Sequence, residues 1–463
     1  MHAPLLTELP YTPDSARLFD AIADLPWAVF LDSGLHHPGQ SRYDMLSAQP
    51  YVRLITRGAL TEIHADGVEL SRDDPFALVQ RFLEIDPSLA GGLPFAGGAI
   101  GYFGYDLARR LECLPARVAD SEKIPEMAIG IYDWAVVVDH LEQRSWLAGQ
   151  GRDAETDIRW GELVARFTEP AMERRRAPFR VTSPITSNFT RERYGRAYRR
   201  VHRYIGDGDC YQVNLAQRFA ARAAGDPWLA YQALRVMNPA PFSAYLSTPY
   251  VQILSASPER FLQVDHGKVQ TKPIKGTRPR AGHARLDAQL AEELRVSEKD
   301  RAENVMIVDL LRNDLSKNCE LGSVRVPRLF DVESFATVHH LVSTVTGKLR
   351  AGRDAIDLLR GCFPGGSITG APKLRSMQII DEVEPNRRGV YCGAIGYIGF
   401  DGGMDTNIAI RTLVYSHGMV RFWAGGGVVA DSSEDAEYQE TFDKAAAMLK
   451  LLQQCAVSRH AGG

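Results

Sequence analysis

Two glycine-rich segments far apart in the chain share one pattern, and this repeat constrains the fold more than any other feature of the sequence. Residues 98–106 read Gly-Ala-Ile-Gly-Tyr-Phe-Gly-Tyr-Asp and residues 393–401 read Gly-Ala-Ile-Gly-Tyr-Ile-Gly-Phe-Asp, so seven of nine positions agree. Both alternate glycine with bulky apolar residues, as strands do where backbones pack closely. The repeat indicates either equivalent strands in two related, intertwined lobes or chance, because Gly and Tyr suit any packed strand end. A dinucleotide-binding loop is not favoured, since no βαβ unit follows the first segment.

Strand-like alternation also recurs through the first 150 residues, and a helical pattern covers residues 75–85. With 463 residues, 45% hydrophobic and 24% charged, the chain is long enough for two or three domains or one large one. We predict an α/β (α+β) fold, a two-lobed sandwich of large antiparallel β-sheets with helices packed outside. The expected regions are an N-terminal region over 1–167, a connector over 168–188 and a catalytic region over 189–455.

Charge and cysteine content exclude several classes of function. A net charge of −3 provides no field that favours nucleic acid, and the arginine cluster at 174–176 is interpreted as a solvated surface. Six scattered cysteines without a C-x-x-C motif argue against disulfides and thiolate metal sites and suit a reducing cytoplasm. No apolar run reaches about eighteen residues and the N-terminus lacks a basic n-region, so we expect neither a membrane span nor a signal peptide.

Lys275 is the strongest candidate for a functional residue. It lies in the run Thr-Lys-Pro-Ile-Lys-Gly-Thr at 271–277, which predicts a strand end entering a tight turn. Residues 261–272 predict a hairpin that would bring Glu259 beside Lys275, and a carboxyl next to an amine is a candidate acid–nucleophile pair. Most lysines at turns are only solvated. Because the pKa of a free lysine is about 10.4, a nucleophilic one requires desolvation or a cationic neighbour.

Two predicted helices carry paired carboxylates. The first starts with a capping-box-like Ser-Glu-Lys-Asp over 297–300 and places Asp300 and Glu303 three residues apart, on one face. The second begins near residue 432 and gives Glu437 and Glu440 the same spacing. Such faces are usually solvated, but two that meet could hold Mg²⁺, which prefers oxygen ligands.

Glycine-rich turns at 364–373 and 425–427 suit a small anionic ligand, and Arg411 at a strand end suits a carboxylate, which it can grip bidentately. The alternative for the glycines is that they only form tight turns.

Together, these motifs resemble the chorismate-utilising enzyme family, strongly over residues 189–452 and more weakly in the N-terminal third. Within that family, anthranilate synthases carry Ala where this chain has Lys275, whereas Lys marks the members that form 4-amino-4-deoxychorismate. Members that use water as nucleophile carry Lys where this chain has Gln212, so the resemblance implies ammonia as the nucleophile.

The resemblance further implies that Lys275 attacks carbon 2 of chorismate while Glu259 protonates the departing 4-hydroxyl, after which ammonia adds at carbon 4. Mg²⁺ would be held by Glu303, Glu437 and Glu440, and a role for Asp300 stays open because relatives often carry Glu there. The residues implied to line the chorismate pocket are Gln212, His340, Ser367, Thr369, Tyr397, Arg411, Gly425, Gly426 and Gly427.

A second pocket implied by the resemblance would bind tryptophan as a regulator or a structural ligand, or its residues only pack the domain. Its residues are Ser33, Gln40, Ser41, Arg42, Tyr43, Pro241, Phe242 and Ser243. Cys362 lacks the flanking glycines of a glutaminase nucleophile, so a separate glutaminase subunit is expected to supply ammonia. The rival interpretations are anthranilate synthase component I and a non-catalytic binder of chorismate or tryptophan that regulates a partner.

Overall fold

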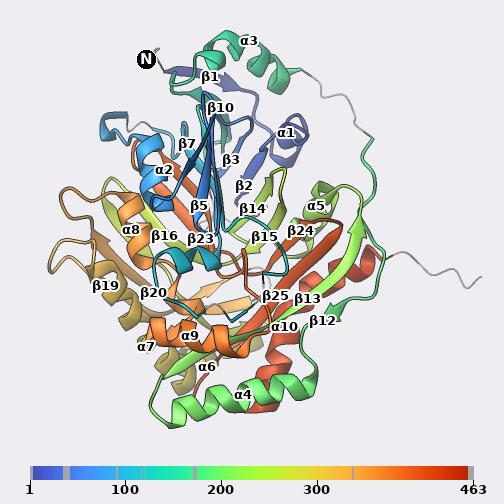
Figure 1. Ribbon diagram of the computed structural model, residues 1–463, viewed down its shortest axis with the longest axis vertical. Helices are drawn as coiled ribbons and strands as arrows, with labels where there is room; N and C mark the ends of the chain where they lie inside the picture. The colour runs from blue at the N-terminus through green and yellow to red at the C-terminus, as the bar shows by residue number, and fades with distance from the viewer. Residues whose placement is uncertain are drawn as a thin grey trace, which may run out of the picture.

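The computed structural model describes residues 4–34, 42–89, 92–115, 117–118, 120–169, 175–335 and 338–456. Within these ranges the chain forms two large antiparallel sheets, with helices around the outside (Figure 1). The predicted fold class is therefore confirmed. None of the helices in the described ranges combines the length and the apolar composition needed to cross a membrane.

The first sheet contains strands from both ends of the chain. Its order, with bounds, is β1 (Leu5–Leu9), β10 (Arg144–Gly149), β9 (Trp134–Asp139), β3 (Tyr43–Ser47), β2 (Val29–Asp32), β14 (Phe242–Ser247), β15 (Gln252–Ser257), β24 (Thr412–Ser416), β25 (Met419–Val428), β13 (Gln212–Ala224) and β11 (Arg180–Val181). Two short strands also pair with β13, namely β12 (Thr186–Ser187) and β21 (Gly370–Ala371).

The second sheet is built in the same way. Its order is β18 (Ile274–Pro279), β20 (Val338–Lys348), β17 (Lys268–Thr271), β16 (Arg260–Asp265), β23 (Met404–Ile408), β22 (Ala394–Gly399), β7 (Gly98–Phe103), β8 (Met127–Tyr132), β4 (Val52–Arg57), β5 (Leu60–His64) and β6 (Val68–Ser71), with β19 (Arg325–Ser334) beside β20. One apolar core joins the inner faces of the two sheets, for example Trp423 and Ile253 from the first with Ile100 and Leu54 from the second.

The helices cover the outer faces and the ends of the sheets (Figure 1). They are α1 (Ala16–Asp20), α2 (Pro75–Leu83), α3 (Ala154–Thr168), α4 (Arg191–Gly206), α5 (Pro227–Met237), α6 (Ala284–Val296), α7 (Glu298–Ser316), α8 (Ala355–Cys362), α9 (Lys373–Val383) and α10 (Glu434–Gln454), with the 3₁₀ turns η1 (Pro87–Leu89), η2 (Tyr105–Arg110) and η3 (Gly366–Ile368). The Ser297 hydroxyl accepts from the amide of Asp300 and so caps α7 as its sequence indicates.

The repeated glycine segments form β7 and β22, which pair directly with each other. Gly101 lies opposite Gly396, and Gly98 lies opposite Gly399. A Cβ at either Gly101 or Gly396 would collide with a carbonyl oxygen of the strand on the other side. The repeat therefore joins the N-terminal third of the chain to its C-terminal third within one sheet.

The hairpin predicted around residues 261–272 is confirmed by the antiparallel pairing of β16 and β17. The expectation that the same ribbon places Lys275 opposite Glu259 is wrong, because β18 pairs with β20. Strands β17 and β18 follow one another along β20. Pro273 separates them, since it has no backbone N–H to donate.

Candidate active site

Lys275 lies near the start of β18, just before Gly276, whose φ of +72° turns the chain in a conformation that favours glycine. Burial lowers the pKa of the Lys275 amine, and so does the positive charge of Lys444, while Glu303 and Glu259 act in the opposite direction. The side chain of Lys275 is half-buried, and its amine lies within the influence of several carboxylates. Burial and the neighbouring cation are the influences that a nucleophilic lysine requires, and the carboxylates oppose them.

Glu259 occupies the turn between β15 and β16 and is only 6% exposed. The hydroxyl of Ser367 donates to its Oε1 at 2.7 Å. Burial raises the pKa of Glu259, although Ser367 and the charges of Lys275, Lys444 and Arg411 oppose the rise. A carboxyl whose pKa is raised is suited to act as a general acid. The two predicted catalytic residues are therefore close enough for their charges to interact, although they do not face each other across one hairpin.

The acidic faces of α7 and α10 meet beside this amine. Both Glu303 and Glu440 act electrostatically on Lys275. Burial raises the pKa of Glu303, and the negative charges of Asp300 and Glu440 add to the rise. Burial also raises the pKa of Glu437, and its charge interaction with Glu440 contributes. The three predicted ligands are therefore near neighbours.

The carboxylates of Glu437 and Glu440 converge on Gly426 of β25. A Cβ there would lie 2.8 Å from Oε2 of Glu437 and 3.2 Å from Oε1 of Glu440. Oε1 of Glu437 accepts from Ser432 at 2.6 Å, but its Oε2 is buried without a hydrogen-bond partner. A buried carboxylate oxygen without a donor suits a cation.

The described residues contain no group of three or more His, Cys, Asp or Glu side chains already arranged to hold a metal ion. Glu440 is already paired, because Nζ of Lys444 lies 2.6 Å from its Oε1 and compensates its charge. Burial alone would raise the pKa of Glu440, but the ion pair with Lys444 brings it below its ordinary value. Asp300 pairs instead with Arg278 at 3.2 Å.

Lys444 also belongs to this group of charges, although no role was predicted for it from the sequence. Besides its contact with Glu440, its amine donates to the carbonyl of Gly425 at 3.1 Å. Its charge acts on both Lys275 and Glu259. Its position in the sequence could have identified it, because Lys444 lies four residues after Glu440 and therefore shares the acidic face of α10.

His340 and Arg411 lie together on the Glu259 side of this group. Burial lowers the pKa of His340 to about 4, and the charge of Arg411 contributes, so its imidazole is neutral at pH 7. The Nδ1 of His340 contacts the hydroxyl of Thr277 at 2.9 Å. Burial lowers the pKa of Arg411, while Glu259 opposes this. Arg411 thus presents a positive charge with little water around it.

Gln212 is fully buried at the start of β13, and neither of its amide atoms has a hydrogen-bond partner. Gly427 lies against it, since a Cβ at Gly427 would be 2.6 Å from Nε2 of Gln212. The hydroxyl of Thr369 does not bond to this amide. It donates to the backbone carbonyl of Gly365 at 3.0 Å and so stabilises the turn at η3. The buried amide of Gln212 is a place for a polar ligand.

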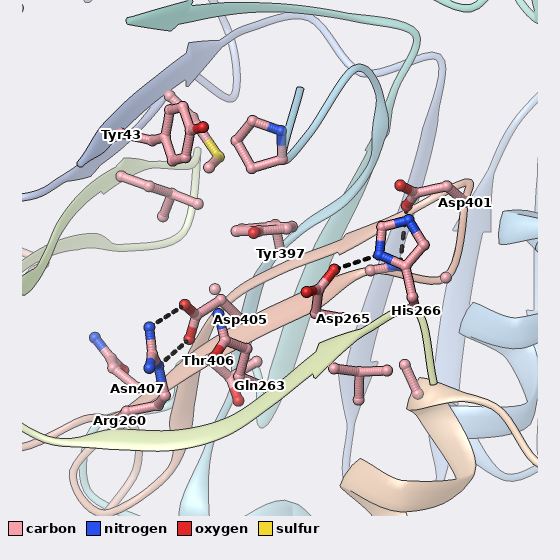
Figure 2. A pocket seen from close by; sticks show the side chains of 18 of the residues that line it. Tyr43, Arg260, Gln263, Asp265, His266, Tyr397, Asp401, Asp405, Thr406 and Asn407 are labelled. Carbon is pink, nitrogen blue, oxygen red and sulfur yellow. Dashed lines mark hydrogen bonds and ion pairs between the residues drawn. The ribbon is translucent and has the colours of Figure 1, made fainter. Parts of the chain in front are cut away.

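Tyr397 does not join these residues. It lines a separate cavity of about 1100 Å³ between the sheets (Figure 2). Its ring packs at 5.2 Å from that of Phe95, and the charges that act on it come from Asp405, Arg260 and other residues of that cavity.

The same cavity collects the residues expected to form a tryptophan pocket. Those in the described part of the chain that line it are Ser33, Arg42, Tyr43, Pro241, Phe242 and Ser243. Gln40 and Ser41 lie outside the described residues. Arg260 forms part of the wall and is bonded through two nitrogens to Asp405 at 3.0 and 2.9 Å (Figure 2). Its guanidinium carbon also lies over the ring of Phe242, 4.9 Å from the centroid.

The two-sheet sandwich, with an amine, a buried carboxyl and acidic helix faces in one site, is an α+β architecture that can be compared with those of known enzymes. The fold matches that of anthranilate synthase component I from Streptococcus pneumoniae TIGR4, with a TM-score of 0.79 and 32% identity over 89% of this chain and 93% of that one. The sequence profile of the chorismate binding enzyme family matches residues 39–450, and the chain belongs to that family.

The sequence identity to two members of the family differs. The chain is 49% identical to aminodeoxychorismate synthase component 1 of Klebsiella aerogenes, over 98% of this chain and all of the relative. It is 38% identical to anthranilate synthase component 1 of Thermus thermophilus, over 96% of this chain and 95% of the relative.

Proposed function

We propose that the chain converts chorismate and ammonia to 4-amino-4-deoxychorismate, a step towards 4-aminobenzoate and folate. The observation that carries this proposal is the desolvated amine of Lys275 within reach of the charge of Glu259. The near full-length identity to aminodeoxychorismate synthase component 1 supports it. The rival product, anthranilate, is favoured less by the lower identity to anthranilate synthase component 1.

In the proposed mechanism the neutral Nζ of Lys275 bonds to carbon 2 of chorismate. The ring double bonds shift, the bond between carbon 4 and its hydroxyl breaks, and Glu259 gives its proton so that water leaves. Ammonia then bonds to carbon 4, the double bonds return, and the bond to Lys275 breaks. Lys275 and the added ammonia each shed a proton on bonding; Lys275 recovers its proton on leaving and Glu259 is reprotonated. Two allylic displacements replace one difficult substitution.

Glu303, Glu437 and Glu440 are the proposed ligands of Mg²⁺. The buried, unpartnered Oε2 of Glu437 and the raised pKa of Glu303 fit a cation at this place. When bound, Mg²⁺ would offset the charge of the ring carboxylate. In the same proposal Lys444 is free to pair with that carboxylate, because the cation would compensate Glu440.

Arg411 is proposed to hold a carboxylate of chorismate, and neutral His340 to contact the substrate beside it. The amides of Gly425, Gly426 and Gly427 would line the pocket, with Gln212 at the place where ammonia arrives. Ser367 and Thr369 shape the opposite wall, where Ser367 holds Glu259. Tyr397 is left out of this pocket because it lines the cavity beside Tyr43 and Phe242.

We further propose that ammonia comes from a separate glutaminase subunit, as the designation component 1 of the relatives suggests. The cavity behind Tyr43 and Phe242 is the proposed site for tryptophan, as a regulator or as a structural ligand. The six cysteines are unpaired, which suits the cytoplasm. The proposed regions remain 1–167, 168–188 and 189–455, although strands before 167 and after 189 share both sheets.

The test is the product formed from chorismate, ammonium and Mg²⁺ by this chain alone. We expect a non-aromatic amino product that a lyase would be needed to convert to 4-aminobenzoate. Fluorescent anthranilate would establish the rival enzyme, and the absence of turnover by folded protein would favour a non-catalytic binder.

A further inference from the structure

Arg388 is a fully enclosed arginine in the turn between α9 and β22, with 1% of its side chain exposed. Its Nε and Nη2 donate to the two carboxylate oxygens of Glu384, at 3.0 and 2.7 Å. The same guanidinium donates to two backbone carbonyls, that of Ile368 at 3.0 Å and that of Asn214 at 2.8 Å. Tyr105 packs against it, with the guanidinium carbon 4.9 Å from the ring centroid.

These two carbonyls belong to segments that carry active-site residues. Ile368 stands directly after Ser367, whose hydroxyl donates to Glu259. Asn214 stands two residues after Gln212 on β13, and its amide donates to the carbonyl of Thr369 at 2.9 Å. One side chain thus clamps the turn that bears Ser367 to the strand that bears Gln212.

The clamp occupies a gap in the sheet. On this edge β13 pairs with β21 at residues 212–213 and with β12 at residues 219–220. Between these places Glu384 accepts from the amide of Ala216 at 2.9 Å and Arg388 donates to the carbonyl of Asn214. The pair of side chains therefore stands where a neighbouring strand would be, and it is held from several sides.

Stability alone is a poor explanation for such a pair. Taking an arginine and a glutamate out of water costs several kcal/mol per ion, and well-packed apolar side chains often serve as well or better. What apolar side chains cannot do is fix two carbonyls in a set geometry, which the planar guanidinium does through its fork of donors.

We propose that Arg388 is a positioning residue for the general acid: through Ile368 it holds the turn that keeps the Ser367 hydroxyl on Glu259. This inference rests on the proposed role of Glu259. Arg388 is not proposed to contact the substrate, so any effect of Arg388 on catalysis must pass through Ser367.

The test is a double-mutant cycle with Arg388→Lys and Ser367→Ala, assayed with chorismate, ammonium and Mg²⁺. Each single variant should lower kcat by about 10- to 100-fold, part of the about 10²- to 10⁴-fold that general acid catalysis provides, and leave KM for chorismate nearly unchanged. The double variant should be no worse than Ser367→Ala alone, because both changes remove the same contact.

The pH profile gives a readout that loss of stability would not move. Hydrogen bonding to a carboxylate favours its charged form, so losing the Ser367 contact raises the pKa of Glu259. The alkaline limb of kcat should shift upwards in both single variants, and no further in the double variant. Kinetic effects that multiply in the double variant, or an unshifted limb in Arg388→Lys, would overturn the proposal.

Arg235→Lys is the matched control, because Arg235 is also buried, at 4% side-chain exposure, and also forks onto a carboxylate, that of Asp32. Its effect should appear in the unfolding midpoint and leave the pH limb in place; a similar limb shift in this control would count against Arg388. Should Arg388→Lys fail to fold, Glu384→Gln, which weakens the same clamp, takes its place in the cycle. Full activity of Glu259→Gln would instead remove the proposed role of Glu259 as general acid, whereas the proposed function itself is tested by the product of the wild type.

Discussion

Gly426 offers a test of the acidic site that leaves every carboxylate in the sequence. In Gly426→Ala the new Cβ would lie 2.8 Å from Oε2 of Glu437, whereas ordinary van der Waals contact begins at 3.4 Å. The carboxylate must therefore retreat by about 0.6 Å, and Glu440 by less. Both atoms end flexible side chains, so the strand itself can stay in place.

A shift of that size exceeds the roughly 0.5 Å within which a functional geometry has to be held. Disturbing the surroundings of metal ligands typically costs about 10- to 100-fold in metal affinity. That range corresponds to about 1.4 to 2.8 kcal/mol. We expect the Mg²⁺ concentration at half-maximal activity to rise by this factor, while the midpoint of urea unfolding stays close to that of the wild type. An unchanged Mg²⁺ titration would refute the placement of the metal between Glu437 and Glu440.

The two neighbouring glycines provide matched controls. In Gly427→Ala the Cβ would meet Nε2 of Gln212 at 2.6 Å, so we expect a higher ammonium requirement and an unaltered Mg²⁺ titration. In Gly425→Ala it would meet the backbone carbonyl of Leu215 at 2.5 Å, and the backbone cannot swing aside as a side chain does. Gly425→Ala should therefore lower the midpoint of urea unfolding. If it changed only the Mg²⁺ titration, the expected difference between Gly425→Ala and Gly426→Ala would be contradicted.

Three further outcomes are expected. Lys275→Ala should abolish a covalent adduct with chorismate in intact-protein mass spectrometry, and an adduct that persists would dismiss the nucleophile. Glu259→Gln should lower kcat by about 10²- to 10⁴-fold and remove the alkaline limb of its pH profile, because the raised pKa keeps this acid protonated to higher pH; a retained limb would belong to another group. Burial would raise the pKa of Asp44, but His140 and Ser33 hold it at about 2. Asp44→Asn should therefore destabilise the fold by about 2 kcal/mol at pH 7, and the difference should close as the pH falls from 3.8 to 2, as measured by urea unfolding at several pH values.

Local patterns predicted the elements well where one face is buried and chain neighbours decide the structure. The strand-like alternation expected in the first 150 residues includes β5, and the helix expected over 75–85 is α2, which ends two residues earlier, at Leu83. The cap at Ser297 likewise depends only on residues within one turn. Such features follow from period and capping alone.

The site depended on contacts that local patterns do not encode. Spacing alone put Glu437 and Glu440 on one face, but the approach of Glu440 to Glu303 depends on α10 packing on β25 of one sheet and α7 on β20 of the other. Strand β18 pairs with β20, which lies far along the chain, and local sequence patterns do not predict such a pairing. The prediction that Glu259 and Lys275 share a site therefore rested on an incorrect strand pairing. The family resemblance placed Tyr397 in the substrate pocket, whereas in the structure it lines the cavity that Tyr43 and Phe242 also line.

The pairing of β7 with β22 has a consequence for how this protein is made. The ribosome completes β7 long before β22 emerges, so a nascent chain carries the edge of β7 without its neighbour for most of translation. All six residues of β7 are buried in the finished protein, and an unpaired apolar edge invites association with other chains. We therefore expect that edge to need cover during synthesis, by chaperones or by the nascent chain itself, until β22 has been translated.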